Sequence, residues 1–263
     1  MAFVLETAEL VKRFDGFIAT RDLSLRVEAG ARHALIGPNG AGKTTVVNLL
    51  TGVLQPSAGR IFLEGSDITA VPVHQRVRRG LSRTFQINQL YADLSPLETI
   101  GLAVSERLGH GGDWWRRMGT RADINAEIVS TLTRFHLDDV MNQPTATLPY
   151  GKQRLLEIAL AIATKPRLLL LDEPAAGVPE GERLDILAAV ASLPRDVTVL
   201  LIEHDMDLVF SFADRISVLV AGALLVEGSP EEVARDPQVR SVYLGESAVA
   251  EKLDSLELHY AKD

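Results

Sequence analysis

The sequence of 263 residues contains no cysteine. This absence excludes disulfides, thiolate metal ligands and thiol nucleophiles, and it fits a reducing compartment. Basic residues are also few: 27 Lys and Arg against 35 Asp and Glu give a net charge of -8. Sequence-independent binding to nucleic acid depends on clustered basic side chains, so we expect no nucleic-acid partner. Arg76, Arg78 and Arg79 form a local basic cluster that stays an open exception.

Long hydrophobic runs are missing as well. The longest apolar stretch, around residues 216–226, is too short and too interrupted to span a bilayer, which needs about 20 residues. The first residues show no basic leader or cleavage pattern, so we expect no export signal. If membranes are involved, another chain must supply the spans. The hydrophobic fraction of 46% is ordinary for a globular chain, and the length allows one large domain or two small lobes.

Two kinds of hydrophobic pattern recur along the chain. Apolar residues that alternate with polar ones predict half-buried antiparallel strands. This pattern is found at Leu23, Leu25 and Val27, and again at Ile61 and Leu63. Continuous apolar runs predict strands covered on both faces of a parallel sheet instead. The continuous runs are residues 34–36, 168–171 and 197–202.

Helical patterns fill the middle of the chain. Ser95, Pro96 and Glu98 have the types of an N-cap, a first-turn proline and a capping-box glutamate, so they predict the start of a helix. A single apolar stripe at helical spacing follows at Ile124, Ile128, Leu132 and Phe135. A further helix is expected between Gly151 and Pro166. These patterns predict a helical lobe inserted between strands.

The segment GPNGAGKTT lies between the apolar run at residues 34–36 and a helical pattern. Gly37 and Gly42 allow backbone N–H groups to converge on phosphate oxygens, and the helix N-terminus adds partial positive charge. Lys43 supplies a charge for β- and γ-phosphates, and the hydroxyl of Thr44 is placed to ligate Mg²⁺. The predicted nucleotide-binding residues of this loop are Gly37, Pro38, Asn39, Gly40, Ala41, Gly42, Lys43, Thr44 and Thr45.

Carboxylates and a histidine follow two of the continuous apolar runs. Asp172 is placed to hold Mg²⁺ through its water shell, and Glu173 to orient and deprotonate water attacking the γ-phosphate. A strand that ends in a solvated turn is the alternative, which the phosphate loop disfavours. His204 lies directly after the run at residues 197–202, between Glu203 and Asp205. Because α/β sheets bind ligands at such strand ends, we predict that His204 contacts the γ-phosphate.

Together these motifs resemble the ATP-binding cassette family, from about Leu5 to Gly245. Gln86, in SRTFQ, matches the family's Q-loop glutamine, and the resemblance implies that it contacts Mg²⁺ and the attacking water and senses a membrane subunit. LPYGKQRLLEIALA stands where the family has its LSGGQ signature. In the family this segment opens a helix that faces ATP bound to a second subunit, which implies a head-to-tail dimer. The signature residues here are Leu148, Pro149, Tyr150, Gly151 and Lys152.

The chain departs from the family pattern at three places. Pro149 replaces the signature serine and has neither a hydroxyl nor a backbone N–H, so the expected donors are the N–H groups of Tyr150, Gly151 and Lys152 and the Lys152 charge. Phe14 replaces the usual tyrosine that stacks on adenine and keeps the aromatic face, although a core position in the small sheet is the alternative. Residues 176–179 match the D-loop but lack its acidic residue.

The resemblance implies an α/β fold: a P-loop NTPase core with a mixed sheet, an antiparallel β-subdomain and a helical signature subdomain. We expect one ATPase domain over residues 1–245, with the helical subdomain at roughly 87–165. Residues 246–263 form a C-terminal tail of open role. Trp114 and Trp115, in a glycine-rich stretch, either contact a partner or pack locally.

Within the family, RTFQ, YGKQRLLEIA, DEPAAG and VYLGE are most similar to subunits of branched-chain amino-acid importers. This similarity implies ATP and Mg²⁺ as cofactors and transmembrane permease subunits as partners. It also implies a second ATPase subunit, identical or a sibling, and a periplasmic solute-binding protein that acts indirectly. We expect a cytoplasmic protein on the inner face of the cell membrane. Residues 91–100 match the surface that receives a coupling helix, with an ordinary loop and helix cap as the alternative.

Other functions remain as alternatives. A urea or amide importer and a lipopolysaccharide exporter use similar cassettes. A soluble ATPase of translation or DNA repair is disfavoured because the chain has neither a second cassette nor a long coiled-coil insertion. A binding module without catalysis is disfavoured because Glu173 and His204 are both present.

Overall fold

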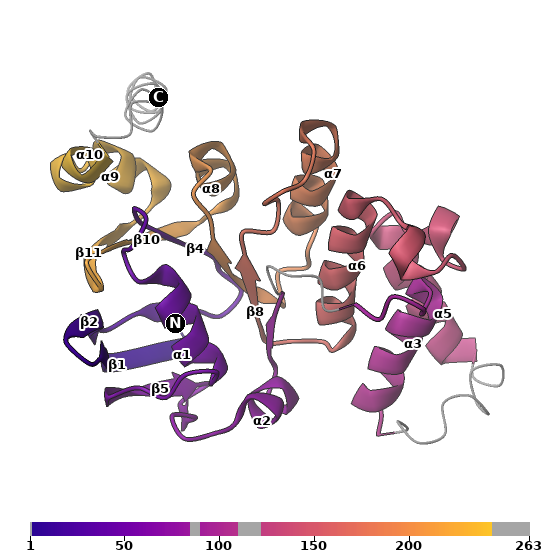
Figure 1. The fold of residues 1–263 in the computed structure, drawn as a ribbon, viewed down its shortest axis with the longest axis horizontal. Helices are drawn as coiled ribbons and strands as arrows, with labels where there is room; N and C mark the ends of the chain where they lie inside the picture. The colour runs from indigo at the N-terminus through magenta and orange to yellow at the C-terminus, as the bar shows by residue number, and fades with distance from the viewer. Residues whose placement is uncertain (1, 85–89, 110–121, 244–263) are drawn as a thin grey trace.

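The computed structural model describes residues 2–84, 90–109 and 122–243. Within them, a six-stranded sheet lies at the centre in the order β11-β10-β4-β9-β8-β7 (Figure 1). Neighbouring strands are parallel except β10 and β11, so the sheet is mixed, as predicted. Its strands are β4 (Arg32–Ile36), β7 (Leu81–Arg83), β8 (Leu168–Asp172), β9 (Thr198–Ile202), β10 (Arg215–Val220) and β11 (Ala223–Gly228).

A second, antiparallel sheet packs beside the first. Its strands are β1 (Phe3–Phe14), β2 (Phe17–Leu23), β3 (Arg26–Glu28), β5 (Ala58–Leu63) and β6 (Ser66–Asp67). The alternating pattern from Leu23 to Val27 is divided between β2 and β3. Thr7 explains the break, because its hydroxyl donates to the carbonyl oxygen of Leu23 and accepts from the N–H of Leu25, both at 2.8 Å. The apolar side chains remain buried although the strand is interrupted.

The helices lie around the central sheet. They are α1 (Lys43–Thr51), α2 (Val73–Arg78), α3 (Pro96–Arg107), α5 (Ala122–Arg134), α6 (Tyr150–Ala163), α7 (Glu180–Ala191), α8 (Met206–Phe212), α9 (Pro230–Arg235) and α10 (Pro237–Tyr243), with 3₁₀ helices η1 (Asp138–Val140) and η2 (Thr145–Thr147). The predicted capping box is confirmed: Ser95 accepts from the N–H of Glu98, whose carboxylate accepts from the N–H of Ser95. Among the described residues, no helix has the length and apolar content needed to cross a membrane.

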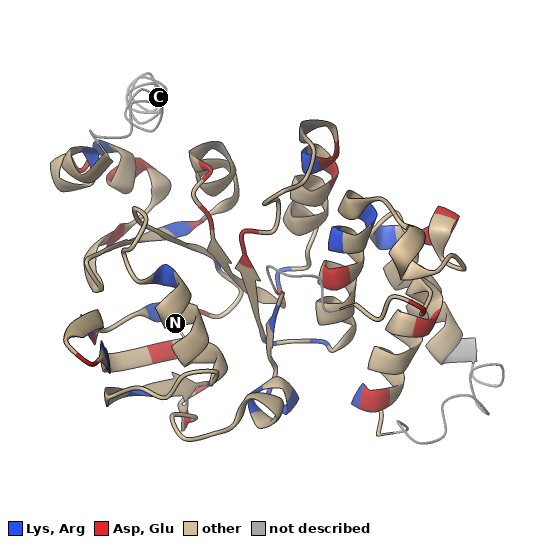
Figure 2. Ribbon diagram, in the orientation of Figure 1, with Lys and Arg blue, Asp and Glu red and all other residues tan. Residues whose placement is uncertain are grey.

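The two faces of the central sheet contact different layers. On β8, Leu168 and Leu170 pack towards α1 and the antiparallel sheet, whereas Leu169 and Leu171 pack towards α3, α5, α6 and α7. This explains the continuous apolar runs, since a strand covered on both faces needs no polar side. Helices α8, α9 and α10 cover β4 and β10 (Figure 1). Acidic segments follow β8 and β9 (Figure 2).

Candidate active site

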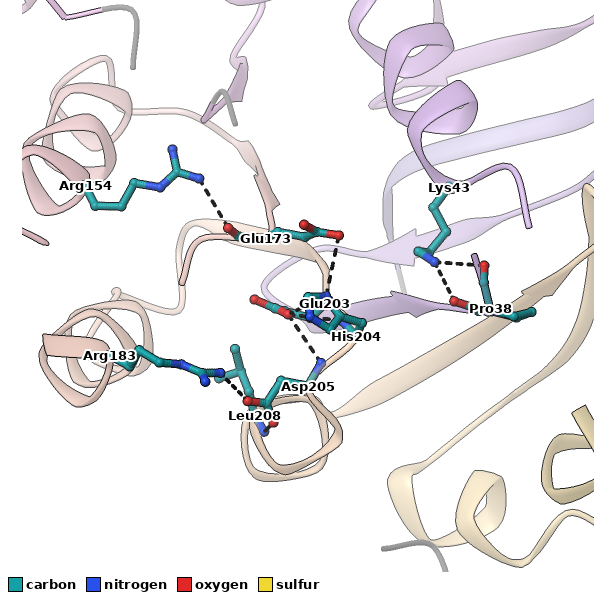
Figure 3. A network of polar contacts seen from close by, with 10 residues as sticks. Pro38, Lys43, Arg154, Glu173, Arg183, Glu203, His204, Asp205 and Leu208 are labelled. Carbon is teal, nitrogen blue, oxygen red and sulfur yellow. Dashed lines mark hydrogen bonds and ion pairs between the residues drawn. The ribbon is translucent and has the colours of Figure 1, made fainter. Parts of the chain in front are cut away.

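The register of the central sheet brings three chain segments together. Ile202, at the end of β9, pairs with Leu35 of β4 on one side and with Asp172 of β8 on the other. The segments that leave these strands therefore start next to one another, where parallel α/β sheets bind their ligands. Four of the predicted site residues lie on these segments and are labelled in Figure 3: Pro38, Lys43, Glu173 and His204.

The loop between β4 and α1 is packed against neighbouring backbone. A Cβ on Gly37 would lie 2.2 Å from the carbonyl oxygen of Leu219, and one on Gly42 would lie 2.5 Å from that of Ala19. Only glycine fits at both positions, because these backbone oxygens cannot move aside. Gly40 has open space at its Cβ position and a φ of 79°, so its backbone conformation is what favours glycine. The glycines thus hold the loop against β10 and β2.

Lys43 begins α1 and lies across this loop. Its Nζ donates to the carbonyl oxygens of Gly37 at 2.5 Å and of Pro38 at 3.1 Å (Figure 3). These bonds keep a full positive charge at the helix N-terminus, where N–H groups add a partial one. Thr44 is exposed in the first turn. Among the other loop residues, Asn39 is exposed, Thr45 is half-buried and Ala41 is buried.

Asp172, at the end of β8, is buried and ion-paired. Arg83 Nη2 lies 2.7 Å from Asp172 Oδ2, and Arg83 Nη1 donates to Asn48 Oδ1 at 2.8 Å. Because Arg83 ends β7 and Asn48 lies on α1, this guanidinium connects the helix of the phosphate loop to the end of β8. Arg83 stands in the motif SRTFQ, but the sequence does not indicate this ion pair, since Asp172 and Asn48 are distant from it in the chain.

The site has oxygen ligands suited to magnesium. Among the described residues, no group of three or more His, Cys, Asp or Glu side chains could hold a metal ion. Mg²⁺, however, is usually bound by one or two carboxylates together with substrate phosphates and water. The hydroxyl of Thr44 and the carboxylate of Asp172 are hard oxygen donors of this kind. The residues present therefore fit a magnesium ion that arrives with a nucleotide.

Glu173 combines a strained backbone with a partly exposed carboxylate. Its φ of 47° is left-handed, which is uncommon for a residue other than glycine. Its N–H donates to the carbonyl oxygen of Ile202 at 2.9 Å, which ties the turn to β9. Glu173 Oε1 lies 3.5 Å from Nδ1 of His204, and 28% of the glutamate side chain is exposed (Figure 3). The two predicted catalytic side chains therefore face each other.

A buried carboxylate supports the exposed His204. Glu203 Oε2 accepts from the backbone N–H of His204 at 3.0 Å and from that of Asp205 at 3.4 Å. Burial raises the pKa of the Glu203 carboxyl, and the two N–H donors oppose this. Arg183 of α7 forms an ion pair with Asp205. Glu203 and Arg183 thus fix the turn that carries His204, although no pattern in the sequence assigns them this position.

The signature segment surrounds the start of α6. Leu148 is buried, Pro149 is the N-cap, and Tyr150 begins the helix with 37% of its surface exposed. A Cβ on Gly177 would lie 3.7 Å from the ring of Tyr150. Tyr150 therefore packs beside the turn that follows β8, on the same side of the molecule as Glu173.

Two of the donors predicted in this segment have acceptors within the chain. The N–H of Gly151 donates to Glu182 Oε2 at 2.9 Å. The ammonium of Lys152 donates to the carbonyl oxygen of His136 and lies 3.0 Å from Asp139 Oδ1. An anion from elsewhere must displace Glu182 to reach Gly151. Contact with a nucleotide of a second subunit stays a prediction.

Phe14 stands at the end of β1 and is 43% exposed. The alternative that it is a core residue is therefore wrong. Lys12 Nζ lies 5.1 Å from the centre of its ring, which is a cation-π contact. Phe17, its partner across the hairpin, is 62% exposed. An accessible aromatic ring is thus present for the predicted stacking on adenine.

A largely apolar groove of about 270 Å³ lies between α2, β7 and α6, and we call it the α2–α6 groove. Its lining includes Val53, Val73, Val77, Leu90, Glu157 and Leu160. The three valines are each more than a third exposed. Tyr91, which follows the lining residue Leu90 in the sequence, is 71% exposed.

Several predicted features lie outside the described residues: Gln86, Trp114, Trp115 and the tail at 246–263.

The sequence matches two protein-family models. The model for "ABC transporter" matches residues 20–176, and the model for "Branched-chain amino acid ATP-binding cassette transporter" matches residues 223–249. The chain is 41% identical to a high-affinity branched-chain amino acid transport ATP-binding protein of Pseudomonas aeruginosa, over 93% of this chain and 98% of the relative. A lipopolysaccharide export system ATP-binding protein of Acidithiobacillus ferridurans is 35% identical, over 94% and 98%.

Solved structures share the fold. The crystal structure of an ATP-binding cassette of an ABC transporter in its ADP conformation is 31% identical to this chain, with a TM-score of 0.77 over 94% of this chain and 100% of that one. The predicted P-loop NTPase fold is therefore confirmed. The sequence matches agree with a phosphate loop, an acidic strand end and a histidine that meet at one edge of the sheet. The chain belongs to the ABC transporter family, as one of its ATP-binding cassette ATPases.

Proposed function

We propose that this chain hydrolyses ATP to power the uptake of branched-chain or related amino acids through separate transmembrane permease subunits. The observation that carries the hydrolytic part is the meeting of the Lys43 loop, Glu173 and His204 at adjoining strand ends. The solute class is supported by the similarity to branched-chain amino acid transport proteins. A periplasmic solute-binding protein would act indirectly, from the far side of a membrane whose cytoplasmic face this chain contacts.

The loop and the first turn of α1 bind the triphosphate. The ammonium of Lys43 turns from the carbonyl oxygens of Gly37 and Pro38 to the β- and γ-phosphates, which are stronger acceptors. Thr44 and Asp172 would hold Mg²⁺, and the bound ion would neutralise charge on the phosphates. Phe14 stacks on the adenine. The family resemblance adds Gln86, which lies outside the described residues.

Glu173 and His204 act on the γ-phosphate. The carboxylate of Glu173 orients the attacking water and accepts its proton. His204 Nδ1 faces Glu173, so the opposite ring nitrogen is left to donate to a γ-phosphate oxygen. Glu203 keeps the backbone of His204 in place during this step.

A second ATPase subunit completes the site, either a copy of this chain or a sibling. The start of α6, from Leu148 to Lys152, faces the ATP of that subunit, because a helix N-terminus favours an anion. The carboxylate of Glu182 accepts a hydrogen bond from the N–H of Gly151, and the γ-phosphate replaces this carboxylate when the subunits close. Release of phosphate after hydrolysis separates the subunits again.

The α2–α6 groove receives the permease. Its exposed valines offer apolar surface to a short helix of a membrane subunit, and Arg83, at the end of β7, also lines it. Export of lipopolysaccharide is the second candidate function. The C-terminal match to the branched-chain transporter model and the higher identity of 41% against 35% favour import.

Glu173→Gln tests the hydrolytic assignment. The variant should bind ATP with unchanged Kd while its turnover falls by about 10²- to 10⁴-fold, because the amide cannot accept the proton. Glu231→Gln makes the same chemical change on α9 and should leave the turnover unchanged. Normal turnover in Glu173→Gln would remove this residue from its role.

Purification of the tagged chain from its native membranes tests the transport assignment. We expect permease subunits and a periplasmic amino-acid receptor to accompany it. Co-purification of ribosomes or DNA would contradict the proposal, and a lipopolysaccharide export apparatus would favour the second candidate.

A further inference from the structure

Arg154 is a buried arginine whose guanidinium reaches the turn that carries Glu173. It lies on α6 and is 1% exposed. Its Nη2 donates to the carbonyl oxygen of Glu173 at 3.2 Å, and its Nε donates to that of Pro174 at 3.3 Å. In Figure 3 the side chain of Arg154 extends from its helix towards Glu173. Arg154 lies within the segment LPYGKQRLLEIALA, but it is not among the residues predicted to contact the nucleotide.

The Arg154 contact fixes one side of a strained residue. Glu173 has a left-handed φ of 47°, and such a conformation persists only where the surroundings hold it. Its N–H is bonded to Ile202 of β9, while its carbonyl oxygen accepts from Arg154 of α6 at 3.2 Å and from the N–H of Ala176, within the turn, at 3.0 Å. The peptide groups on both sides of Glu173 are thus held by β9, by α6 and by the turn itself. Arg154 is the contact that connects this turn to the helical lobe.

A second buried group holds Arg154. Its Nη1 donates to Glu157 Oε2 at 2.5 Å, one helical turn along α6, and both side chains are less than a tenth exposed. A planar guanidinium can bond a carboxylate and carbonyl oxygens together, which an ammonium cannot do with the same geometry. Glu157 also lines the α2–α6 groove. The arginine is therefore anchored on the wall of that groove.

We propose that Arg154 is a positioning residue for hydrolysis, which holds the Glu173 turn so that the carboxylate meets the attacking water. The proposal rests on the proposed function of Glu173 as the base. Arg154 does not touch the substrate. Its loss should therefore change the rate of the chemical step and leave ATP binding unaltered.

The test replaces both members of the buried pair with apolar side chains. Removing one partner of a buried ion pair destabilises a protein, whereas apolar replacement of both is often tolerated. We expect the double variant Arg154→Met, Glu157→Leu to lose about 10- to 100-fold in kcat, because small misplacement of a reacting group has effects of this size. The KM and Kd for ATP should stay within about twofold of those of the unaltered chain, as P-loop contacts are intact.

Arg107→Met, Glu127→Leu is the control, at a partly exposed arginine–glutamate pair of the same helical region whose Glu127 also pairs with Lys165. This pair joins α3 to α5, with Arg107 Nη2 2.8 Å from the carboxylate, and it does not touch Glu173. The control should keep its kcat. Equal losses of kcat in both double variants would overturn the proposal, because they would show a general effect of weakening the helical region.

A conservative variant separates positioning from packing. Arg154→Lys keeps a charge opposite Glu157 but cannot serve both carbonyl oxygens, so we expect it to lose at least about fivefold in kcat while its circular dichroism spectrum remains that of the folded chain. Full activity in this variant would overturn the proposal. The proposed function fails separately, if Glu173→Gln hydrolyses ATP normally.

Discussion

At the scale of the residue, the end of β8 gives two neighbouring carboxylates different surroundings. Asp172 is buried and paired with Arg83, whereas Glu173 turns into a left-handed conformation and faces His204. Because Asp172 is the last residue of the strand and Glu173 begins the turn, the adjacent acids can serve different tasks. A paired, buried carboxylate suits a fixed charge, and a partly exposed one suits proton transfer.

The buried His33 provides a prediction on pH. Its Nε2 lies 2.8 Å from Ser217 Oγ, and burial lowers its pKa to about 4, with Glu227 opposing and Arg215 adding to the effect. An unfolded histidine has a pKa of about 6.5. As the pH falls below this value, the unfolded chain binds a proton that the folded chain does not, so His33 reduces the free energy of unfolding.

We therefore expect that lowering the pH from 7 to 5 reduces the free energy of unfolding by about 2 kcal/mol through His33. This reduction should be absent in His33→Gln. Urea unfolding of both proteins at the two pH values measures it as a difference, in which the titration of carboxylates cancels. Parallel curves for the unaltered chain and His33→Gln would contradict the assignment.

At the scale of the element, local patterns predict some of the helices and strands. The capping box at Ser95 and the continuous run at residues 168–171 predict elements that the structure contains. What cannot be predicted is how distant elements meet. Arg83 with Asp172 and Gly151 with Glu182 are contacts between segments far apart in the chain, and they depend on packing that no local pattern records.

The contact between α6 and α7 gives a prediction at this scale. Glu182 places a carboxylate at the N-terminus of α6, where the proposed site accepts a γ-phosphate. In a Glu173→Gln background, Glu182→Ala should tighten ATP-dependent dimerisation by about fivefold or more, because one charge-assisted hydrogen bond no longer has to be broken. Sedimentation at a series of ATP concentrations measures this change.

Asp185→Ala is the control for this experiment. Asp185 lies one turn further along α7 and lines the same cavity of about 280 Å³ as Glu182 and Gly151. Its removal changes the net charge equally. If both variants dimerise to the same extent, the effect is general electrostatics and the competition between carboxylate and phosphate is refuted.

At the scale of the whole molecule, the fold follows from the motifs and the family they resemble, while the surfaces do not. The phosphate loop, the acidic strand end and the histidine predict a P-loop core, which the structure and its relatives confirm. The α2–α6 groove is assembled from Val53, Val77 and Leu160, which are scattered in sequence. Single exposed valines carry no signal until the fold gathers them.

The groove provides the prediction at this scale. Val77→Asp should abolish co-purification with membrane subunits, because a charge would have to be buried against their apolar surface. The ATPase rate of the isolated chain should remain unchanged. Val129→Asp, at a 49% exposed position of α5, should retain the membrane subunits. Loss of the complex in both variants, or in neither, would place the permease elsewhere.

The helix α6 contains three contacts at a spacing of three residues. Gly151 meets Glu182, Arg154 meets the backbone of Glu173, and Glu157 lines the groove. Residues at this spacing lie along one side of a helix, which moves as a rigid rod. A small rotation of α6 would therefore alter all three contacts in the same instant. Docking of the permease, closure of the two ATPase subunits and hydrolysis of ATP would then be coupled directly by the motion of one helix, without intermediate conformational changes.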